Sequence, residues 1–174
     1  VLDEIQTGLG RTGKMFAHDH EAGADPDMLV LGKALGGGVY PVSAVLTSRA
    51  IMTLLRAGDH GSTFGGNPLA AAVALEALNV IVDERLAERA MALGARLLTG
   101  LASIRSPLVR EVRGQGLLVG VEIDPRYATA RLVVDRLLAH GILSKDTHGT
   151  VVRFAPPLVI AREEIDWAIA ETRK

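Results

Sequence analysis

Residues 27–33, Asp-Met-Leu-Val-Leu-Gly-Lys, decide the fold class of this chain. The run from Met28 to Leu31 is continuously apolar and lies between turn-forming residues. This pattern is typical of a strand in a sheet that is covered on both faces. The stretch therefore predicts an α/β domain, with Lys33 at the end of one of its strands.

The residues on either side of this strand extend the same domain. Residues 69–82 are apolar nearly all round, which predicts a helix buried on most faces. Pro68 suits the first turn of that helix. In chain order we expect a strand over 1–6, a glycine loop over 8–13, the strand over 27–32, a buried strand over 42–47, a short helix over 51–56, a polar loop over 60–67 and the helix over 69–82.

From Asp83 onward the pattern changes to amphipathic helices and short strands, which is typical of a separate α+β unit. We therefore divide the chain into residues 1–83, part of a large α/β domain, and residues 84–174, a small α+β domain. The elements expected in the second part are a helix over 85–101, strands over 109–113 and 117–123, a helix over 128–139, strands over 142–144 and 151–154, and a helix from residue 162.

Composition excludes several functional classes. The chain has 174 residues, of which 48% are apolar, and a net charge of -1 from 19 basic and 20 acidic residues. With so balanced a charge, the chain has no strong positive potential that would attract nucleic acid or an anionic membrane. A small diffusible partner is favoured instead. No cysteine is present, which rules out disulfides and cysteine-ligated metals and fits a cytoplasmic location. Val1-Leu2 enters directly on a strand, as expected of a piece of a longer protein.

Two nucleotide-binding motifs are matched incompletely. Gly8, Gly10 and Gly13 fit the spacing of the dinucleotide fingerprint, but that fingerprint requires a helix packed on the glycines. Residues 14–27 contain two histidines, a glycine and a proline without an apolar helical stripe. The same stretch nearly forms a phosphate-binding P-loop, but Met15 occupies the place of the hydroxyl that binds magnesium. A nicotinamide enzyme therefore remains a minor alternative.

The sequence gives little support for a metal site or for a serine hydrolase. His18 and His20 lack further ligands at metal-binding spacing, so we interpret them as solvated loop histidines and expect no metal. The sequence also lacks a Gly-x-Ser-x-Gly nucleophile elbow.

Lys33 and Asp3 are the main candidates for chemistry. Ligand crevices form at the carboxyl ends of strands in open α/β sheets, and a lysine there can supply the amine of Schiff-base chemistry. A surface lysine beside a turn is the simpler local interpretation. Asp3 changes the balance, because a carboxylate in an apolar strand requires a cationic partner, and a protonated pyridine nitrogen is one such partner. Strand alternation would place Ile5 on the same face as Asp3.

Two later segments are suited to binding anions. The loop over residues 60–68 contains Ser62 and Thr63 and leads into a helix amino terminus, which favours phosphate. Arg153 lies within an apolar run, where a guanidinium requires a carboxylate. That carboxylate could belong to a substrate or to a structural ion pair.

Together these segments resemble one family, the class III or ω-amino-acid branch of the fold type I pyridoxal-phosphate (PLP) aminotransferases. Its hallmark segments are matched by Leu2-Asp3-Glu4-Ile5-Gln6-Thr7-Gly8, by Leu31-Gly32-Lys33-Ala34-Leu35 and by residues 60–68. Residues 38–45, 147–149 and 153–160 look like the ornithine-using members of the branch. The resemblance covers nearly the whole chain and implies a large-domain remainder followed by a small carboxy-terminal domain.

The resemblance also implies roles for particular residues. Lys33 would bind PLP covalently and move the proton, Asp3 would keep the pyridine nitrogen protonated, Gln6 would approach the ring hydroxyl and Ile5 would pack on the ring. Ser62 and Thr63 would reach the phosphate of a neighbouring subunit in a homodimer-type assembly. Arg153 would bind the carboxylate of the oxo acid. The implied reaction transfers the δ-amino group of ornithine to 2-oxoglutarate.

Members of this family carry a long segment before the strand of Asp3, which supplies most of the large-domain sheet. We therefore expect exposed apolar surface, self-association, and an amino-terminal half either on a separate chain or lost from a broken gene. The alternatives to the ornithine reaction are a class III enzyme for acetylornithine or 4-aminobutyrate, and a catalytically silent fragment that binds a partner aminotransferase chain.

Overall fold

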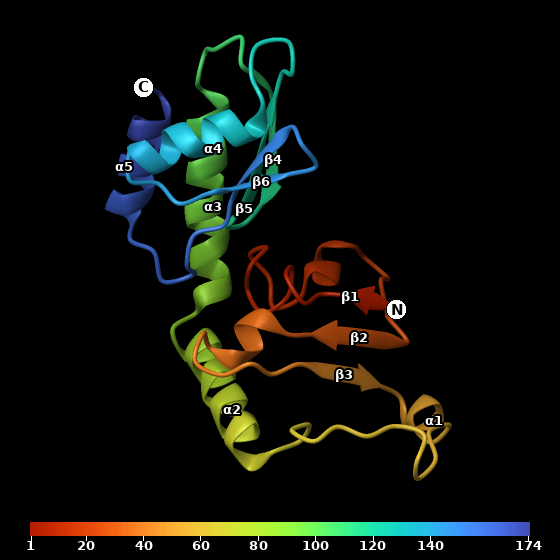
Figure 1. The fold of residues 1–174 in the computed structure, drawn as a ribbon. Helices are drawn as coiled ribbons and strands as arrows, with labels where there is room; N and C mark the ends of the chain where they lie inside the picture. The colour runs from red at the N-terminus through yellow and green to blue at the C-terminus, as the bar shows by residue number, and fades with distance from the viewer.

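The computed structural model describes all residues, 1–174, and contains two sheets joined by helices (Figure 1). None of the helices combines the length and the apolar composition that a membrane span requires. The elements are β1 (Leu2–Asp3), η1 (Ala17–His20), β2 (Met28–Leu31), η2 (Lys33–Gly36), β3 (Ala44–Thr47), α1 (Arg49–Met52), α2 (Pro68–Asp83), α3 (Leu86–Ala102), β4 (Val109–Gln115), β5 (Leu118–Ile123), α4 (Ala130–Ala139), β6 (Lys145–Thr147), β7 (Val151–Phe154) and α5 (Arg162–Thr172).

The first sheet belongs to what we call the three-stranded unit, which comprises β1, β2, β3 and α2. Its strand order is β1-β2-β3, with β1 parallel to β2 and β3 antiparallel to β2. The predicted strand over 27–32 is therefore confirmed as the centre of this sheet. Its alternate residues Leu29 and Leu31 are buried in a cluster of six residues.

Two segments of this unit that were predicted to be buried are partly exposed, and the exposed apolar surface that was also expected is confirmed. The strand over 42–47 is β3, an edge strand on which Val45 and Leu46 are about half exposed. Helix α2 begins as predicted, with Asn67 accepting the backbone N–H of Ala70, but buries only Ala70 and Ile81. No other element of the chain covers the remaining apolar faces of β3 and α2, so these surfaces are exposed.

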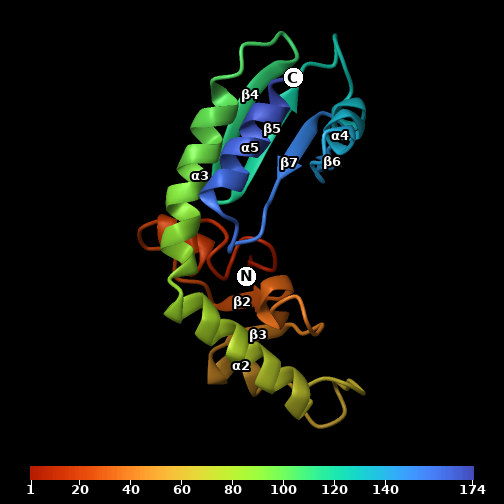
Figure 2. The same cartoon turned by 90° about the vertical axis from the view of Figure 1, so that its left-hand side faces the viewer.

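The second sheet belongs to the four-stranded unit, which comprises β4 to β7 with α3, α4 and α5. Its strand order is β4-β5-β7-β6, antiparallel throughout. The helices lie against one face of the sheet (Figure 2). A core of 15 buried residues fills the space between them, including Leu97, Val119, Val152 and Ile165.

Close backbone packing joins the two units. A Cβ added at Gly94 of α3 would lie 2.1 Å from the carbonyl oxygen of Gly116, so only glycine fits there. Gly116 has a φ of +53° and packs in turn on the backbone of Thr12 and Gly13. The glycine loop of the first unit is therefore locked against the β4–β5 turn of the second.

Candidate active site

Asp3 lies at the carboxyl end of β1, directly beside Val30 of the parallel strand β2. Its side chain is exposed, and Oδ1 accepts a hydrogen bond from the backbone N–H of Ile5 at 3.0 Å. No lysine, arginine or histidine forms an ion pair with it. The carboxylate therefore remains available to a cationic group from outside the chain.

Lys33 follows β2 at the same edge of the sheet as Asp3, because the two strands are parallel. It is exposed rather than half-buried as a crevice lysine would be, and it forms no ion pair. Its φ of +45° is uncommon for a residue with a side chain, and such backbone strain is concentrated at functional sites.

The Ile5 side chain also lies at this edge of the sheet, but strand alternation does not place it there. The strand ends at Asp3, so the predicted alternation does not extend to Ile5. A Cβ added at Gly32 would lie 3.3 Å from Ile5 Cγ2, which shows that the Ile5 side chain packs against the residue preceding Lys33. Glycine at this position makes the close approach possible.

Arg153 comes to the same place from the other unit. It lies on β7, 147 positions along the chain from Gln6, and its Nη1 donates to Gln6 Oε1 at 3.4 Å. Arg153 has no carboxylate partner, so the structural ion pair considered from the sequence is absent. A half-buried guanidinium held only by a neutral amide is available to an anionic ligand.

Ser62 and Thr63 are not brought to this place. They lie in the exposed loop between α1 and α2, and Ser62 Oγ accepts a hydrogen bond from the backbone N–H of Gly65 at 2.9 Å. Ser62 lines a cavity of about 400 Å³ together with residues 40–43 and 64–67. That cavity includes neither Asp3 nor Lys33.

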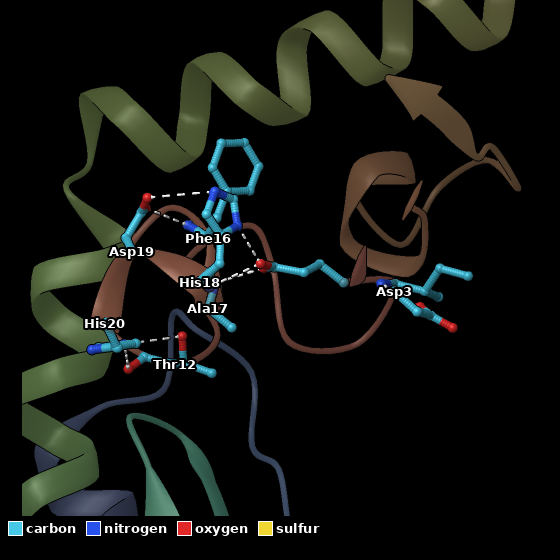
Figure 3. Close-up of polar contacts among 9 residues, drawn as sticks. Asp3, Thr12, Phe16, Ala17, His18, Asp19 and His20 are labelled. Carbon is cyan, nitrogen blue, oxygen red and sulfur yellow. Dashed lines mark hydrogen bonds and ion pairs between the residues drawn. The ribbon is translucent and has the colours of Figure 1, made fainter. Parts of the chain in front are cut away.

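A buried carboxylate behind Asp3 went unrecognised in the sequence. Glu4 is 3% exposed and accepts hydrogen bonds from the backbone N–H groups of Ala17 and His18, at 2.5 and 2.9 Å. Its Oε1 lies 2.6 Å from His18 Nδ1. In Figure 3 the Asp3 side chain points away from this cluster. The side chains of the neighbouring residues Asp3 and Glu4 therefore lie on opposite sides of the backbone.

The interpretation of the two histidines as solvated is wrong. His18 is bound to Glu4 and stacks on Phe16 with ring centroids 5.5 Å apart. The Nε2 atom of His20 lies 3.1 Å from the carbonyl oxygen of Thr12 (Figure 3). His20 therefore contacts the glycine loop directly, whereas His18 contacts Glu4, which precedes the loop. No group of His, Cys, Asp or Glu in the structure is arranged to hold a metal ion.

Arg11 is the second residue missed from the sequence. Its Nη1 donates to the carbonyl oxygens of Leu117 and Pro156, at 3.0 and 2.5 Å. Burial lowers the pKa of this guanidinium, because loss of water disfavours the charged form. Pro156 follows the β7 strand of Arg153, so Arg11 holds that strand against the first unit.

The glycine loop therefore has a structural role. Residues 8–13 contact Glu4, α3 and the β4–β5 turn, and a Cβ added at Gly13 would lie 2.8 Å from Met91 Cε of α3. The segment that follows is a short 3₁₀ turn, η1, not the long helix that a dinucleotide fingerprint requires.

The charges at this edge define what it can bind. Asp3 is an anion without a cation, and Arg153 a cation without an anion, while Lys33 provides a primary amine between β2 and a glycine run. Such a set suits a ligand with a cationic ring atom, a carbonyl carbon and a carboxylate.

Comparison with known proteins gives a consistent result. Residues 1–174 match the family described as Aminotransferase class-III. The ornithine aminotransferase of Geobacillus sp. strain WCH70 is 53% identical over 174 residues, which are 100% of this chain and 43% of that protein. The chain thus spans less than half the length of this relative.

Solved structures agree with this match. The ornithine aminotransferase of Toxoplasma gondii superposes with a TM-score of 0.93 at 50% identity, covering 98% of this chain and 41% of that one. In a further structure of that enzyme, PLP partially occupies the active site. The acetylornithine aminotransferase of Elizabethkingia anophelis gives a TM-score of 0.90 at 46% identity, covering 98% of this chain and 43% of that one.

Proposed function

Because the chain belongs to the class III aminotransferases, we propose that it carries the lysine-bearing part of an enzyme that transfers the δ-amino group of ornithine to 2-oxoglutarate. The observation that carries this proposal is the contact between Arg153 and Gln6, which brings a guanidinium free of carboxylates to the segment of Asp3. The ornithine aminotransferases at 53% and 50% identity support the choice of substrate.

The residues present fit pyridoxal phosphate as cofactor. Lys33 would hold it covalently, Asp3 would bind its ring nitrogen, Gln6 would approach its ring hydroxyl, and Ile5 would pack on its ring. When bound, PLP supplies an electron sink for the carbon that loses a proton. The unpaired Asp3 carboxylate supports this assignment, since a carboxylate keeps a pyridine nitrogen protonated.

The chain's own residues then divide the remaining work. The amine of Lys33 would move a proton to and from the substrate carbon. Arg153 would bind the carboxylate of the oxo acid through paired N–H groups and thereby orient it. Ser62 and Thr63 would bind the cofactor phosphate of a neighbouring subunit, which is supported by their exposure and by the absence of Lys33 from the cavity that Ser62 lines.

The proposal extends to the assembly. Residues 1–83 would belong to the PLP-binding large domain and residues 84–174 to the small domain. An amino-terminal portion, in the same protein or on a separate chain, would cover the exposed faces of β3 and α2. The complete enzyme would be a cytoplasmic homodimer. The exposure of Leu46, Leu69, Leu75 and Val82 supports such a cover.

A second candidate is the acetylornithine reaction, favoured by the structural match at 46% identity. The remaining alternatives are a 4-aminobutyrate enzyme and a silent fragment that only binds a partner aminotransferase chain.

The test is covalent capture of the cofactor. The protein is incubated with PLP, reduced with borohydride and analysed by peptide mass spectrometry, with Lys33→Ala as the variant and Lys14→Ala as the matched control. We expect the adduct on Lys33 alone. Assays with ornithine, acetylornithine and 4-aminobutyrate then identify the donor. No adduct on Lys33, with or without an amino-terminal portion, would favour the silent fragment.

A further inference from the structure

A proline interrupts the antiparallel ladder between β5 and β7 close to Arg153. Ile123 donates a backbone hydrogen bond to Thr150 at 2.8 Å, and in such a ladder every second pair of facing residues is hydrogen-bonded. In the register of these strands, the third such pair after Ile123 and Thr150 would be Leu117 and Pro156. Pro156 has no N–H, so the ladder supplies no donor for the carbonyl oxygen of Leu117.

Arg11 of the glycine loop supplies the missing donor. Its Nη1 donates to the carbonyl oxygen of Leu117 at 3.0 Å and to that of Pro156 at 2.5 Å. Its own carbonyl oxygen accepts the backbone N–H of Leu117 at 3.0 Å. A residue of the three-stranded unit therefore completes the ladder of the four-stranded unit. Its guanidinium is partly buried, and charge-assisted hydrogen bonds are strengthened where water is excluded.

The hydrogen bonds of Arg11 join the two segments that carry Arg153 and Gln6. Arg153 lies three residues before Pro156, and Gln6 lies five residues before Arg11. The direct contact from Arg153 Nη1 to Gln6 Oε1 is 3.4 Å long, which makes it a weak hydrogen bond. The shorter hydrogen bonds of Arg11 are better able to hold the end of β7 against the segment of Gln6.

Resting on the proposed function, we propose that Arg11 is a positioning residue that fixes the Arg153 guanidinium beside Gln6 and thereby sets the affinity for the carboxylate of the oxo acid. Arg11 acts only through the carbonyl groups at the ends of β5 and β7. Binding groups must be held close to their productive geometry, and a small displacement caused by a distant substitution weakens binding strongly.

The first experiment measures the binding of glutarate to the PLP-loaded protein by calorimetry. Glutarate is an unreactive dicarboxylate that lacks the keto group of 2-oxoglutarate. Arg11→Met is compared with the unaltered protein and with Arg89→Met as matched control. Arg89 donates to the carbonyl oxygens of Val159 and Ile160, at 3.1 and 2.6 Å, so it holds the same segment from helix α3 of the same unit.

We expect Arg11→Met to weaken glutarate binding about tenfold, an effect equal to the loss of one charge-assisted hydrogen bond. Arg11→Lys keeps the charge and can donate to one of the two carbonyl oxygens, so it should weaken binding by a smaller factor. Arg89→Met should leave binding unchanged. The NMR signals of the Gln6 side-chain amide should shift in Arg11→Met and not in Arg89→Met, because they report the contact with Arg153.

A second variant separates positioning from a purely structural role. Pro156→Ala supplies the backbone N–H that the ladder lacks, without joining β7 to the glycine loop. The double variant Arg11→Met/Pro156→Ala should therefore regain stability in urea denaturation relative to Arg11→Met, while glutarate binding stays weak.

Three outcomes would overturn the inference. Recovery of glutarate binding in the double variant would mean that Arg11 only completes the sheet. Unchanged binding in Arg11→Met would mean that Arg153 is positioned without Arg11, and if that variant does not fold, unchanged binding in Arg11→Lys has the same meaning. Absence of glutarate binding to the unaltered protein would overturn the proposed role of Arg153 in the reaction and, with it, the inference that rests on this role.

Discussion

In the four-stranded unit, three helices cover one face of the sheet and 15 buried residues form a single core. In the three-stranded unit the corresponding cluster has six residues, and the largest helix, α2, buries only two of its own. The six-residue cluster even includes Leu86, the first residue of α3. The core of the first unit is therefore formed in part by a residue of the second.

Most of the candidate functional residues lie in the unit with the smaller core. Asp3 and Lys33 lie on the incompletely packed unit, where their charges have no partner in the chain. Arg153 lies on the well-packed unit and reaches across to Gln6. The well-packed second unit thus carries Arg153, proposed to bind substrate, while the incompletely packed first unit carries Asp3 and Lys33, proposed to bind the cofactor.

The largest expected effect tests this difference in packing with one substitution in each unit. Leu97 of α3 is 1% exposed, and Leu97→Ala should lower the free energy of unfolding by about 3 kcal/mol through lost burial and a residual cavity. Leu46 of β3 is 47% exposed, and Leu46→Ala should change it by less than about 1 kcal/mol. Urea denaturation followed by circular dichroism measures both.

Leu46→Ala should also reduce self-association, because it removes part of an exposed apolar surface. Sedimentation velocity of the two variants checks this. Similar losses of stability in Leu97→Ala and Leu46→Ala would mean that β3 is covered in solution, and the contrast between the units would be lost.

An intermediate effect is expected within the three-stranded unit itself. Glu4→Gln leaves one oxygen to accept hydrogen bonds from two backbone N–H groups and His18, so at least one buried donor loses its partner. The local opening free energy of residues 16–20 should fall by about 1–3 kcal/mol. Amide hydrogen exchange at Ala17 and His18 reports this loss.

The matched control is Glu21→Gln, an exposed glutamate just after η1. Protection at Leu97 in the core of the other unit should not change in either variant. If Glu4→Gln lowered protection at Leu97 as much as at Ala17, the two units would open together and not independently.

The sequence predicted most elements of the fold because their apolar periodicity is local. The strand over 27–32 and the helices beginning near residues 68, 85 and 162 are found at or within a residue or two of their predicted starts. The strand predicted over 142–144 lies instead at 145–147, where it pairs with β7. Ile142 is buried in the core without belonging to a strand, so its apolar character gave the wrong register.

The residues of the candidate site also fall into two groups, those that local sequence could predict and those that it could not. Lys33 and Asp3 could be selected because each is an ionisable residue at the end of an apolar run. Glu4 and Arg11 could not, because their partners are backbone groups contributed by distant segments, such as the carbonyl of Pro156. The burial of β3 and α2 was overestimated for a related reason. An apolar sequence indicates that a segment tends to be buried, but it does not show which other part of the protein packs against it.

The smallest expected effect concerns a charge in the well-packed unit. Asp124 follows β5 and is 8% exposed, and its hydrogen bonds with the side chain and backbone of Arg126 lower its pKa from 3.8 to about 2. A lowered folded-state pKa contributes stability above the ordinary value, and this contribution is lost as the pH falls through the folded-state pKa. Asp124→Asn should therefore reduce the thermal midpoint slightly at pH 7.

The difference between Asp124→Asn and the unaltered chain should shrink between pH 4 and about pH 2, where the carboxylate becomes protonated in both states. Thermal denaturation at several pH values measures it, with Asp135→Asn, an exposed carboxylate paired with Arg131, as control. A difference that persists unchanged at low pH would mean that Asp124 acts through the shape of its turn and not through its charge. In either case the loss of stability should be confined to the four-stranded unit, because the side-chain hydrogen bonds of Asp124 are made only to Arg126 in the same turn. Hydrogen exchange at Ala17 should therefore remain unaltered.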